Sequence, residues 1–304
     1  DRHKNIMKEI VEISQDAGLE VWIDNWGLGG PPGDKSHFLS YYPEAHQVYS
    51  NGEIDPVRVC LNNENFRKFT KEWIDVVEFT GAKSIFWDEP HLVGKNMENG
   101  KPKIWTCRCE TCQKLFEERY GKKMPTEFTS EVDEFRIDTV VDYFKEVTAY
   151  SKNKGMYNAV CVMLGESYGI NLETIDRISS LDTLDNVGSD PYWLGHKDVN
   201  PYQFVYEATR KNLDICNRFN KDHNIWIQCY STPRGREEEI IYATEAAYDA
   251  GARTILAWGY RGSDANDYRA RNPELTWKVT GDAMGRILNR ERDANLDIYR
   301  KLVK

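Results

Sequence analysis

Two neighbouring carboxylic acids, Asp88 and Glu89, end the apolar run Ile85-Phe86-Trp87 and precede a proline. A charged carboxylate at the lip of a buried strand is unfavourable unless its surroundings compensate. Apolar walls or a second carboxylate raise the pKa of an acid, which then stays protonated near neutral pH. Asp88 beside Glu89, with Trp87 as an apolar wall, offers both effects. The stretch therefore predicts a proton donor, with Glu89 as the general acid.

Three cysteines lie within six residues, as Cys107-x-Cys109-x-x-Cys112. Three thiolates can surround one tetrahedral Zn²⁺, but a closed structural site needs a fourth ligand, for which Cys60 and His91 are the candidates. The odd total of seven cysteines favours a reduced compartment such as the cytoplasm, and a metal rather than a disulfide framework. The other three cysteines lie on elements whose patterns predict burial as small hydrophobic residues: Cys161, Cys216 and Cys229.

The composition excludes several classes of partner. The chain has 304 residues, is 40% hydrophobic and carries a formal net charge of −9, so it can bury a large core but is a poor ligand for nucleic acid or anionic membranes. It contains no apolar run long enough for a transmembrane helix. We expect no nucleic-acid and no membrane partner.

Strand and helix patterns alternate along the whole chain, which predicts an α/β fold with a parallel sheet covered by helices. Helices are expected at about 3–17, 64–80, 130–153, 171–180, 201–220, 236–250 and 273–302. Strands are expected at 19–25, 82–90, 156–164, 186–193, 224–230 and 253–260. In the first helix, Ile6, Ile10, Val11 and Ile13 share one predicted face.

Two closures of such a sheet compete, a doubly wound sheet and a (β/α)8 TIM barrel. No Gly-x-Gly-x-x-Gly turn follows any strand, so dinucleotide binding has no support and the barrel is favoured. The leading helix has no strand before it, and only six strands are visible. By analogy with the eight-unit barrel, we expect one or two strands upstream of Asp1. The prediction is a single barrel domain over 1–304, with a cysteine-bearing excursion at 91–128.

Polar and aromatic residues gather where the predicted strands end, which is the face that carries chemistry in barrels of this kind. Paired carboxylates suit cleavage of a glycosidic bond, and aromatic faces stack on sugar rings. The candidate carboxylates are Asp88, Glu89, Glu166 and Asp190, each of which could instead cap a helix. The candidate substrate-binding residues, for which structural roles are the alternative, are Trp26, Trp87, His91, Tyr192, Trp193, Gln228, Trp258, Tyr260 and Arg261.

The segments RVCLNNENFRKF and CRCETCQKLFEERYG together resemble the zinc-loop elements of family-42 β-galactosidases, which are TIM-barrel glycoside hydrolases. The resemblance implies that Cys60, Cys107, Cys109 and Cys112 bind one structural Zn²⁺ with no open position for water. It also implies that Glu89 takes the place of the family's strand-four acid/base. An oligosaccharide or glycoside substrate and, because related barrels often form trimers, a homo-oligomer are further implications.

One departure from the family leaves the mechanism open, because Gln228 and Cys229 stand where the family has its nucleophilic glutamate. In the favoured alternative, Asp190, or less readily Glu166, is the second carboxylate. In the next, Asp88 and Glu89 work as a pair in substrate-assisted catalysis, resembling hexosaminidases. In the third, the barrel only binds carbohydrate. A metal-dependent hydrolase is disfavoured, because the six histidines form no His-x-His pair.

Overall fold

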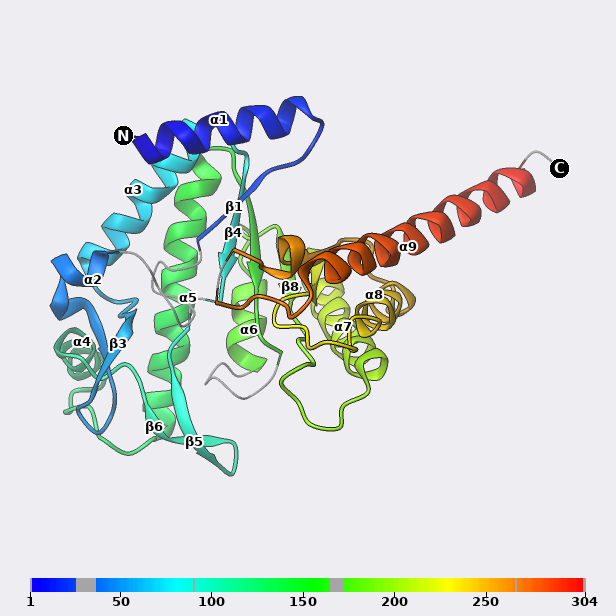
Figure 1. Ribbon diagram of the computed structural model, residues 1–304. Helices are drawn as coiled ribbons and strands as arrows, with labels where there is room; N and C mark the ends of the chain where they lie inside the picture. The colour runs from blue at the N-terminus through cyan, green and yellow to red at the C-terminus, as the bar shows by residue number, and fades with distance from the viewer. Residues whose placement is uncertain (1, 26–36, 90, 165–171, 266, 303–304) are drawn as a thin grey trace. The chain divides into compact units, whose positions relative to one another are not determined.

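A computed structural model describes residues 2–25, 37–89, 91–164, 172–265 and 267–302 (Figure 1). The chain divides into two compact units, Asp1–Asn186 and Val187–Lys304. Each unit has its own parallel strands and covering helices, so the predicted α/β class is confirmed. The expectation of a single domain stays a prediction.

Three parallel strands form the centre of the first unit, in the order β1 (Trp22–Asp24), β4 (Ser84–Asp88) and β7 (Tyr157–Cys161). Asp24 lies opposite Phe86, and Asp88 lies opposite Cys161. The carboxyl ends of all three strands therefore meet at one edge, which brings the residues after them close together. Each strand falls inside its predicted range but is shorter.

The first unit's helices are α1 (Arg2–Asp16), α3 (Glu64–Thr80), α5 (Ser130–Asn153) and α6 (Leu172–Ser179). Helix α3 contacts both α1 and α5, and α5 contacts α6 (Figure 1). Helix α3 begins where the Asn63 side chain accepts a hydrogen bond from the Phe66 amide at 3.0 Å, and it ends at Gly81, whose φ is +86°. These end signals are local, which explains why the sequence predicts α3 and α5 to the residue.

Helix α1 differs from its predicted packing. Only Val11 of the predicted face is fully buried, whereas Ile6, Ile10 and Ile13 are 43%, 50% and 62% exposed. The periodicity identified the helix, but it did not identify which apolar residues the first unit covers.

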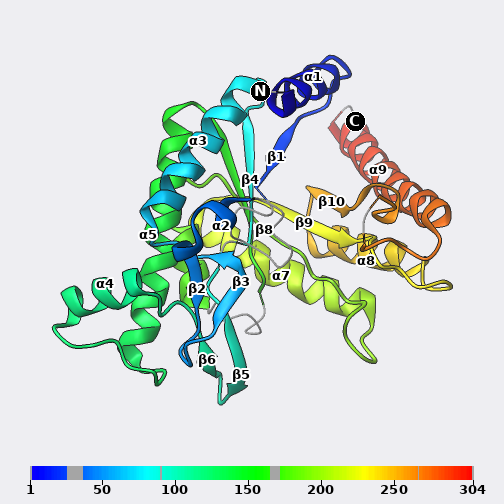
Figure 2. The same cartoon turned by 60° about the vertical axis from the view of Figure 1, so that its left-hand side comes forward.

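Two antiparallel hairpins were not predicted: β2 (His46–Val48) with β3 (Ile54–Val59), and β5 (Gly94–Glu98) with β6 (Lys101–Trp105) (Figure 2). The turn of the second is Asn99-Gly100, with φ of +52° and +76°, which is a recognisable hairpin signal. Short elements accompany the hairpins: α2 (Phe38–Tyr41), the 3₁₀ turn η1 (Pro43–Ala45) and α4 (Glu110–Tyr120). The excursion at 91–128 is thus an ordered hairpin and helix.

The second unit contains β8 (Asn186–Ser189), β9 (Asp222–Gln228) and β10 (Ile255–Trp258), with β9 parallel to β10. Its helices are α7 (Pro201–Phe219), α8 (Glu239–Ala250) and α9 (Pro273–Leu302), and α8 contacts both others. A cluster of alanine and isoleucine side chains from β9 and α8 forms its core. Among the described helices of either unit, none has the length and apolar character needed to cross a membrane.

Candidate active site and cysteine cluster

Glu89 follows β4 directly and has an unusual backbone for a glutamate, with φ at +44°. Its amide donates to the carbonyl of Cys161 at 3.3 Å, and the residue is only 8% exposed. The left-handed region is costly for residues other than glycine, so the surrounding structure must hold Glu89 there. A buried carboxylic acid in a strained position at the carboxyl edge of a sheet is typical of a functional group.

Asp88 lies at the end of β4 beside two other carboxyl groups. Its backbone amide donates to the Asn25 side chain at 2.8 Å, and the Asn25 amide donates to Phe86 at 3.1 Å, which ties the ends of β1 and β4 together. Burial, and then the negative charges of Asp24 and Glu89, raise the pKa of Asp88 well above its ordinary value. The neighbouring-carboxylate effect expected from the sequence is therefore present at Asp88.

Trp87 lies on the opposite face of β4 from Asp88, because successive side chains of a strand alternate. It is fully buried, its indole N–H donates to Asn158 at 3.0 Å, and its ring packs against Trp73 and Phe144. This placement favours the core interpretation of Trp87 over the substrate-lining one.

His91 is also buried, with 1% exposure, and its Nδ1 hydrogen-bonds the carbonyl oxygen of Glu89. Because a carbonyl can only accept, Nδ1 carries the proton. Burial, together with the positive charges of Arg58 and Arg136, lowers the pKa of His91 to about 4. His91 is therefore neutral at pH 7 and supports the Glu89 backbone.

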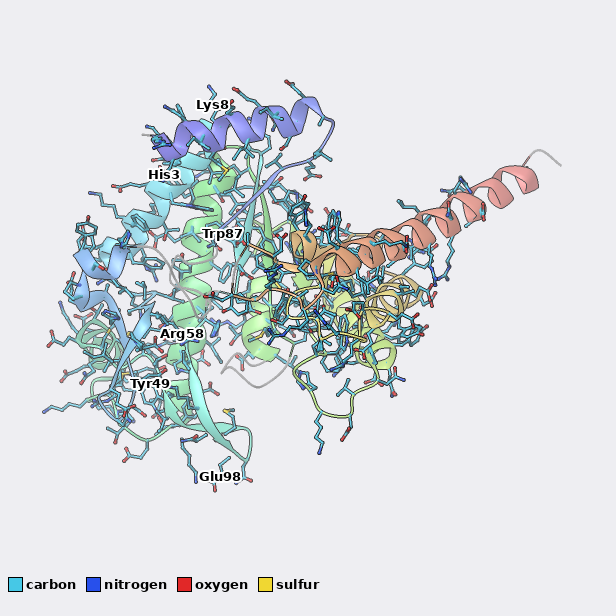
Figure 3. All side chains as sticks on the ribbon, viewed as in Figure 1. His3, Lys8, Tyr49, Arg58, Trp87 and Glu98 are labelled. Atoms are coloured by element: carbon cyan, nitrogen blue, oxygen red, sulfur yellow. The ribbon has the colours of Figure 1, made fainter. Side chains whose placement is uncertain are left out.

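Arg58 belongs to a buried group of charged and polar side chains on and beside the first hairpin (Figure 3). Its guanidinium lies 2.9 Å from the carboxylate of Asp55, which also accepts the hydroxyl of Tyr49 at 2.6 Å. Burial opposes ionisation of Asp55, but the hydrogen bonds from Tyr49 and Val57 and the charge of Arg58 leave its pKa lower than usual. The pair anchors the hairpin next to His91.

Four cysteines form a compact buried cluster in the first unit. Cys60 follows β3, Cys107 and Cys109 precede α4, and Cys112 lies in its first turn. The sulfur of Cys60 lies 3.4 Å from that of Cys112 and 3.5 Å from that of Cys109, and all four sulfurs lie within 4.8 Å of one another. Cys60, rather than His91, is thus the fourth member.

The spacing fits one tetrahedral metal ion. Metal–sulfur bonds of about 2.3 Å place tetrahedral sulfurs about 3.8 Å apart, whereas a disulfide would bring two of them to about 2.05 Å. Hydrogen bonds from Cys107 and the other two thiols lower the pKa of Cys109, whereas those with Cys107 and Cys109 raise the pKa of Cys60. A bound metal would favour the thiolate form of all four cysteines.

The strand-end residues of the second unit have mostly structural contacts. Trp193 is buried and donates from its indole N–H to Glu239 at 2.6 Å. Gln228, 3% exposed, accepts the Leu194 amide at 3.0 Å. Tyr192, half-buried, meets Tyr230 edge to face. Gln228 and Trp193 thus hold the loop after β8.

The other predicted site residues differ in accessibility. Asp190 is half-buried after β8, and Trp258 is half-buried at the end of β10 with its ring edge-on to Trp226. Tyr260 is 68% exposed against Trp277, and Arg261 pairs with Asp264 and Glu274. Trp26 and Glu166 lie outside the described residues.

The sequence places Asp24 and Asn25 at the end of a predicted strand, just as Asp88 and Glu89 end the next one, but it does not show that Asn25 binds the backbone of β4. Two other polar residues near Glu89, Arg136 and Gln47, were missed. Arg136 shares a helical face with Val132 and is 3% exposed. A lone charge on an apolar face was the available signal. The spacing around Gln47 offers no such signal.

Solved structures with the same fold include several glycoside hydrolases. A β-galactosidase from the Antarctic haloarchaeon Halorubrum lacusprofundi is 15% identical, with a TM-score of 0.68 over 92% of this chain and 50% of its own. A β-galactosidase from the psychrophilic Marinomonas ef1 is 12% identical, with a TM-score of 0.66 over 95% and 52%. The catalytic domain of a β-amylase from Paenibacillus polymyxa is 13% identical, with a TM-score of 0.60 over 91% and 85%.

This chain therefore spans about half the length of the two β-galactosidases that it matches. No protein-family model matches the sequence, and neither does any curated protein. At these identities the likeness concerns the fold alone. In its fold, the chain is similar to these glycoside hydrolases and to a family-42 β-galactosidase from G. stearothermophilus.

Proposed function

We propose that this protein hydrolyses glycosidic bonds and that Glu89 is its general acid. The observation that carries the proposal is the position of Glu89, a buried carboxylic acid with a strained backbone beside Asp88 at the carboxyl edge of a parallel sheet. The similarity of the fold to glycoside hydrolases supports this proposal by analogy.

In the proposed reaction, the Glu89 carboxyl protonates the departing glycosidic oxygen. Asp190 acts as the second carboxylate, either attacking the anomeric carbon or activating water. A separation of about 5–5.5 Å between the two carboxyl groups would give retention, and about 6.5–9.5 Å inversion. The alternative keeps Asp88 and Glu89 as one unit, in which Asp88 positions a group of the substrate. Its raised pKa lets Asp88 donate a hydrogen bond as a neutral acid.

We further propose that the four cysteines bind structural Zn²⁺. A closed set of four thiolates leaves no position for a reacting water, so the ion would fix the loops around it. The side chain of Asn62, which donates to the Cys112 sulfur at 3.5 Å and to Thr139 at 3.0 Å, would steady one ligand.

The test is hydrolysis of a panel of aryl and natural glycosides by the wild type and by Glu89→Gln. The variant should lose about 10²–10⁴-fold in kcat, with less loss for substrates whose leaving group needs no protonation. Glu98→Gln, a change at an exposed glutamate of β5, is the matched control. Asp190→Asn should also inactivate if Asp190 is the second carboxylate, and NMR of the first sugar product distinguishes retention from inversion. Glu89→Gln with wild-type turnover would contradict the assignment.

A second candidate is a carbohydrate-binding barrel without catalysis. It is favoured by Gln228, which stands in place of an attacking glutamate and uses its side-chain oxygen to bind the Leu194 amide. Oligosaccharide binding by calorimetry, with no turnover by the wild type on any glycoside, would support this candidate.

A further inference from the structure

We propose that Gln47 is a positioning residue that couples the cysteine cluster to the backbone around Glu89, so that metal binding determines how firmly the acid is held. The coupling itself concerns only the first unit. It rests on the proposed function for one point, the role of Glu89 as the acid.

Gln47, on β2, is completely buried and bonds to three different segments of the chain. Its side-chain nitrogen donates to the carbonyl of Val59 at 3.1 Å and to that of His91 at 3.2 Å. Its side-chain oxygen accepts the hydroxyl of Thr106. Val59 immediately precedes Cys60 and Thr106 immediately precedes Cys107, so one amide group joins the backbone beside two cysteines of the cluster to His91.

Thr106 extends this connection to a neighbouring part of the same loop. Its hydroxyl oxygen accepts the amide of Val93 at 2.7 Å, and its own amide donates to the Val93 carbonyl at 2.9 Å. Arg136 closes the arrangement, donating to the carbonyl of Thr106 at 2.5 Å and to that of Val93 at 3.1 Å. The backbone before Cys107 is therefore fixed to the backbone that follows His91.

The last connection leads from His91 to Glu89. The imidazole of His91 donates to the Glu89 carbonyl, at the residue whose φ is +44°. An unbroken set of contacts thus runs from the cluster through Gln47 and His91 to Glu89. Every group in it is buried, so movement at the cysteines leaves a buried donor or acceptor unpaired unless the Glu89 backbone moves too.

This coupling can be measured by hydrogen exchange without any substrate. The amide of Val93 reports directly, because its acceptor is the Thr106 hydroxyl that Gln47 holds. In the zinc-loaded protein, Gln47→Met should raise the exchange rate of the Val93 amide about tenfold, with the metal still bound in a one-to-one ratio. Methionine keeps the length of the side chain and removes its hydrogen bonds.

The matched control is Gln113→Met. Gln113 lies next to Cys112, and its side chain donates to the Arg108 carbonyl at 3.0 Å, away from residues 91–93 in sequence. This variant should leave the exchange of the Val93 amide within about twofold of the wild type. Removal of zinc from the wild type with a chelator should increase the same exchange, and zinc addition should reverse it. In the Gln47→Met variant, chelation should cause little further increase in the exchange rate of the Val93 amide.

The coupling is refuted if Gln47→Met binds zinc while Val93 exchanges at the wild-type rate. It is equally refuted if chelation of the wild type leaves that rate unchanged, an outcome that can be read even if the variant does not fold. A negative hydrolysis assay would overturn the proposed function and leave the exchange result standing. An unchanged exchange rate of the Val93 amide would overturn the coupling, whatever the result of the hydrolysis assay.

Discussion

Replacing Asp88 by asparagine tests whether the site holds a carboxylic acid at an energetic cost. Asparagine has nearly the same shape as aspartate, and no residue in the described part of the chain hydrogen-bonds the Asp88 carboxylate, so the substitution removes mainly the charge. At pH 8, ionisation of Asp88 costs more free energy in the folded protein than in the unfolded chain, because burial and the charges of Asp24 and Glu89 raise its pKa. We expect Asp88→Asn to be more stable than the wild type at that pH.

The sign of this change in the free energy of unfolding follows from the linkage between folding and proton binding. The pKa of Asp88 is raised in the folded state, whereas an unfolded aspartate ionises at about 3.9. The stabilising contribution of the neutral acid is therefore complete below about pH 4 and is lost as the pH rises through the folded-state pKa. Each tenfold change in acid strength corresponds to about 1.4 kcal/mol. Because the pKa lies well above its ordinary value, we expect a clear gain in the free energy of unfolding at pH 8 and little gain at pH 3.5.

The assay is urea unfolding of both proteins from pH 3.5 to 8.5 with the metal content held constant. Asp55→Asn is a control of opposite sign, because Tyr49 and Arg58 hold the ionised form of Asp55 and its pKa is lowered. That variant should be destabilised at pH 7, with the loss shrinking as the pH falls below about 4. If Asp88→Asn were destabilised equally at all pH values, the reasoning about the gathered carboxyl groups would be refuted.

Two further changes probe the metal and the core of the first unit. Chelation should lower the melting temperature. It should also let the four clustered cysteines react with a thiol reagent before the three other buried cysteines, Cys161, Cys216 and Cys229. Simultaneous reaction of all seven would contradict a local metal site. Trp87→Ala should reduce the free energy of unfolding by about 3–5 kcal/mol, measured by urea denaturation, because the indole is fully buried between Trp73 and Phe144; a loss below about 1 kcal/mol would contradict the core placement.

The elements predicted most accurately from the sequence are those whose end signals are local. Asn63 and Thr129 cap α3 and α5 through hydrogen bonds to amides three residues later, so these helices begin where the sequence says. The hairpin formed by β2 and β3 was missed because β2 has only three residues and its pairing with β3 changes register between His46 and Val48. Tertiary contacts, rather than propensity, determine such a strand.

The types of residue at the candidate site could be predicted from the sequence, but the hydrogen bonds that hold them in place could not. The position of the acids followed from an apolar strand ending in polar residues, and the cysteine spacing identified three of the four clustered thiols. The role of Trp87 needed strand alternation, which places it opposite Asp88. Gln47 and Arg136 are far from Glu89 in sequence, and their importance arises only from hydrogen bonds that folding creates.

The register of the second hairpin explains how one loop can serve both the acid and the cysteines. Gly94 pairs with Trp105, and the next pair away from the turn is Val93 with Thr106, so the base of the hairpin lies shortly after Glu89 and immediately before Cys107. A slip of one residue would turn the Thr106 hydroxyl to the opposite face, away from Gln47. The turn at Asn99-Gly100 fixes the register and therefore sets the distance between the proposed acid and the metal ligands. The hairpin thus determines which residues of the two base segments face each other.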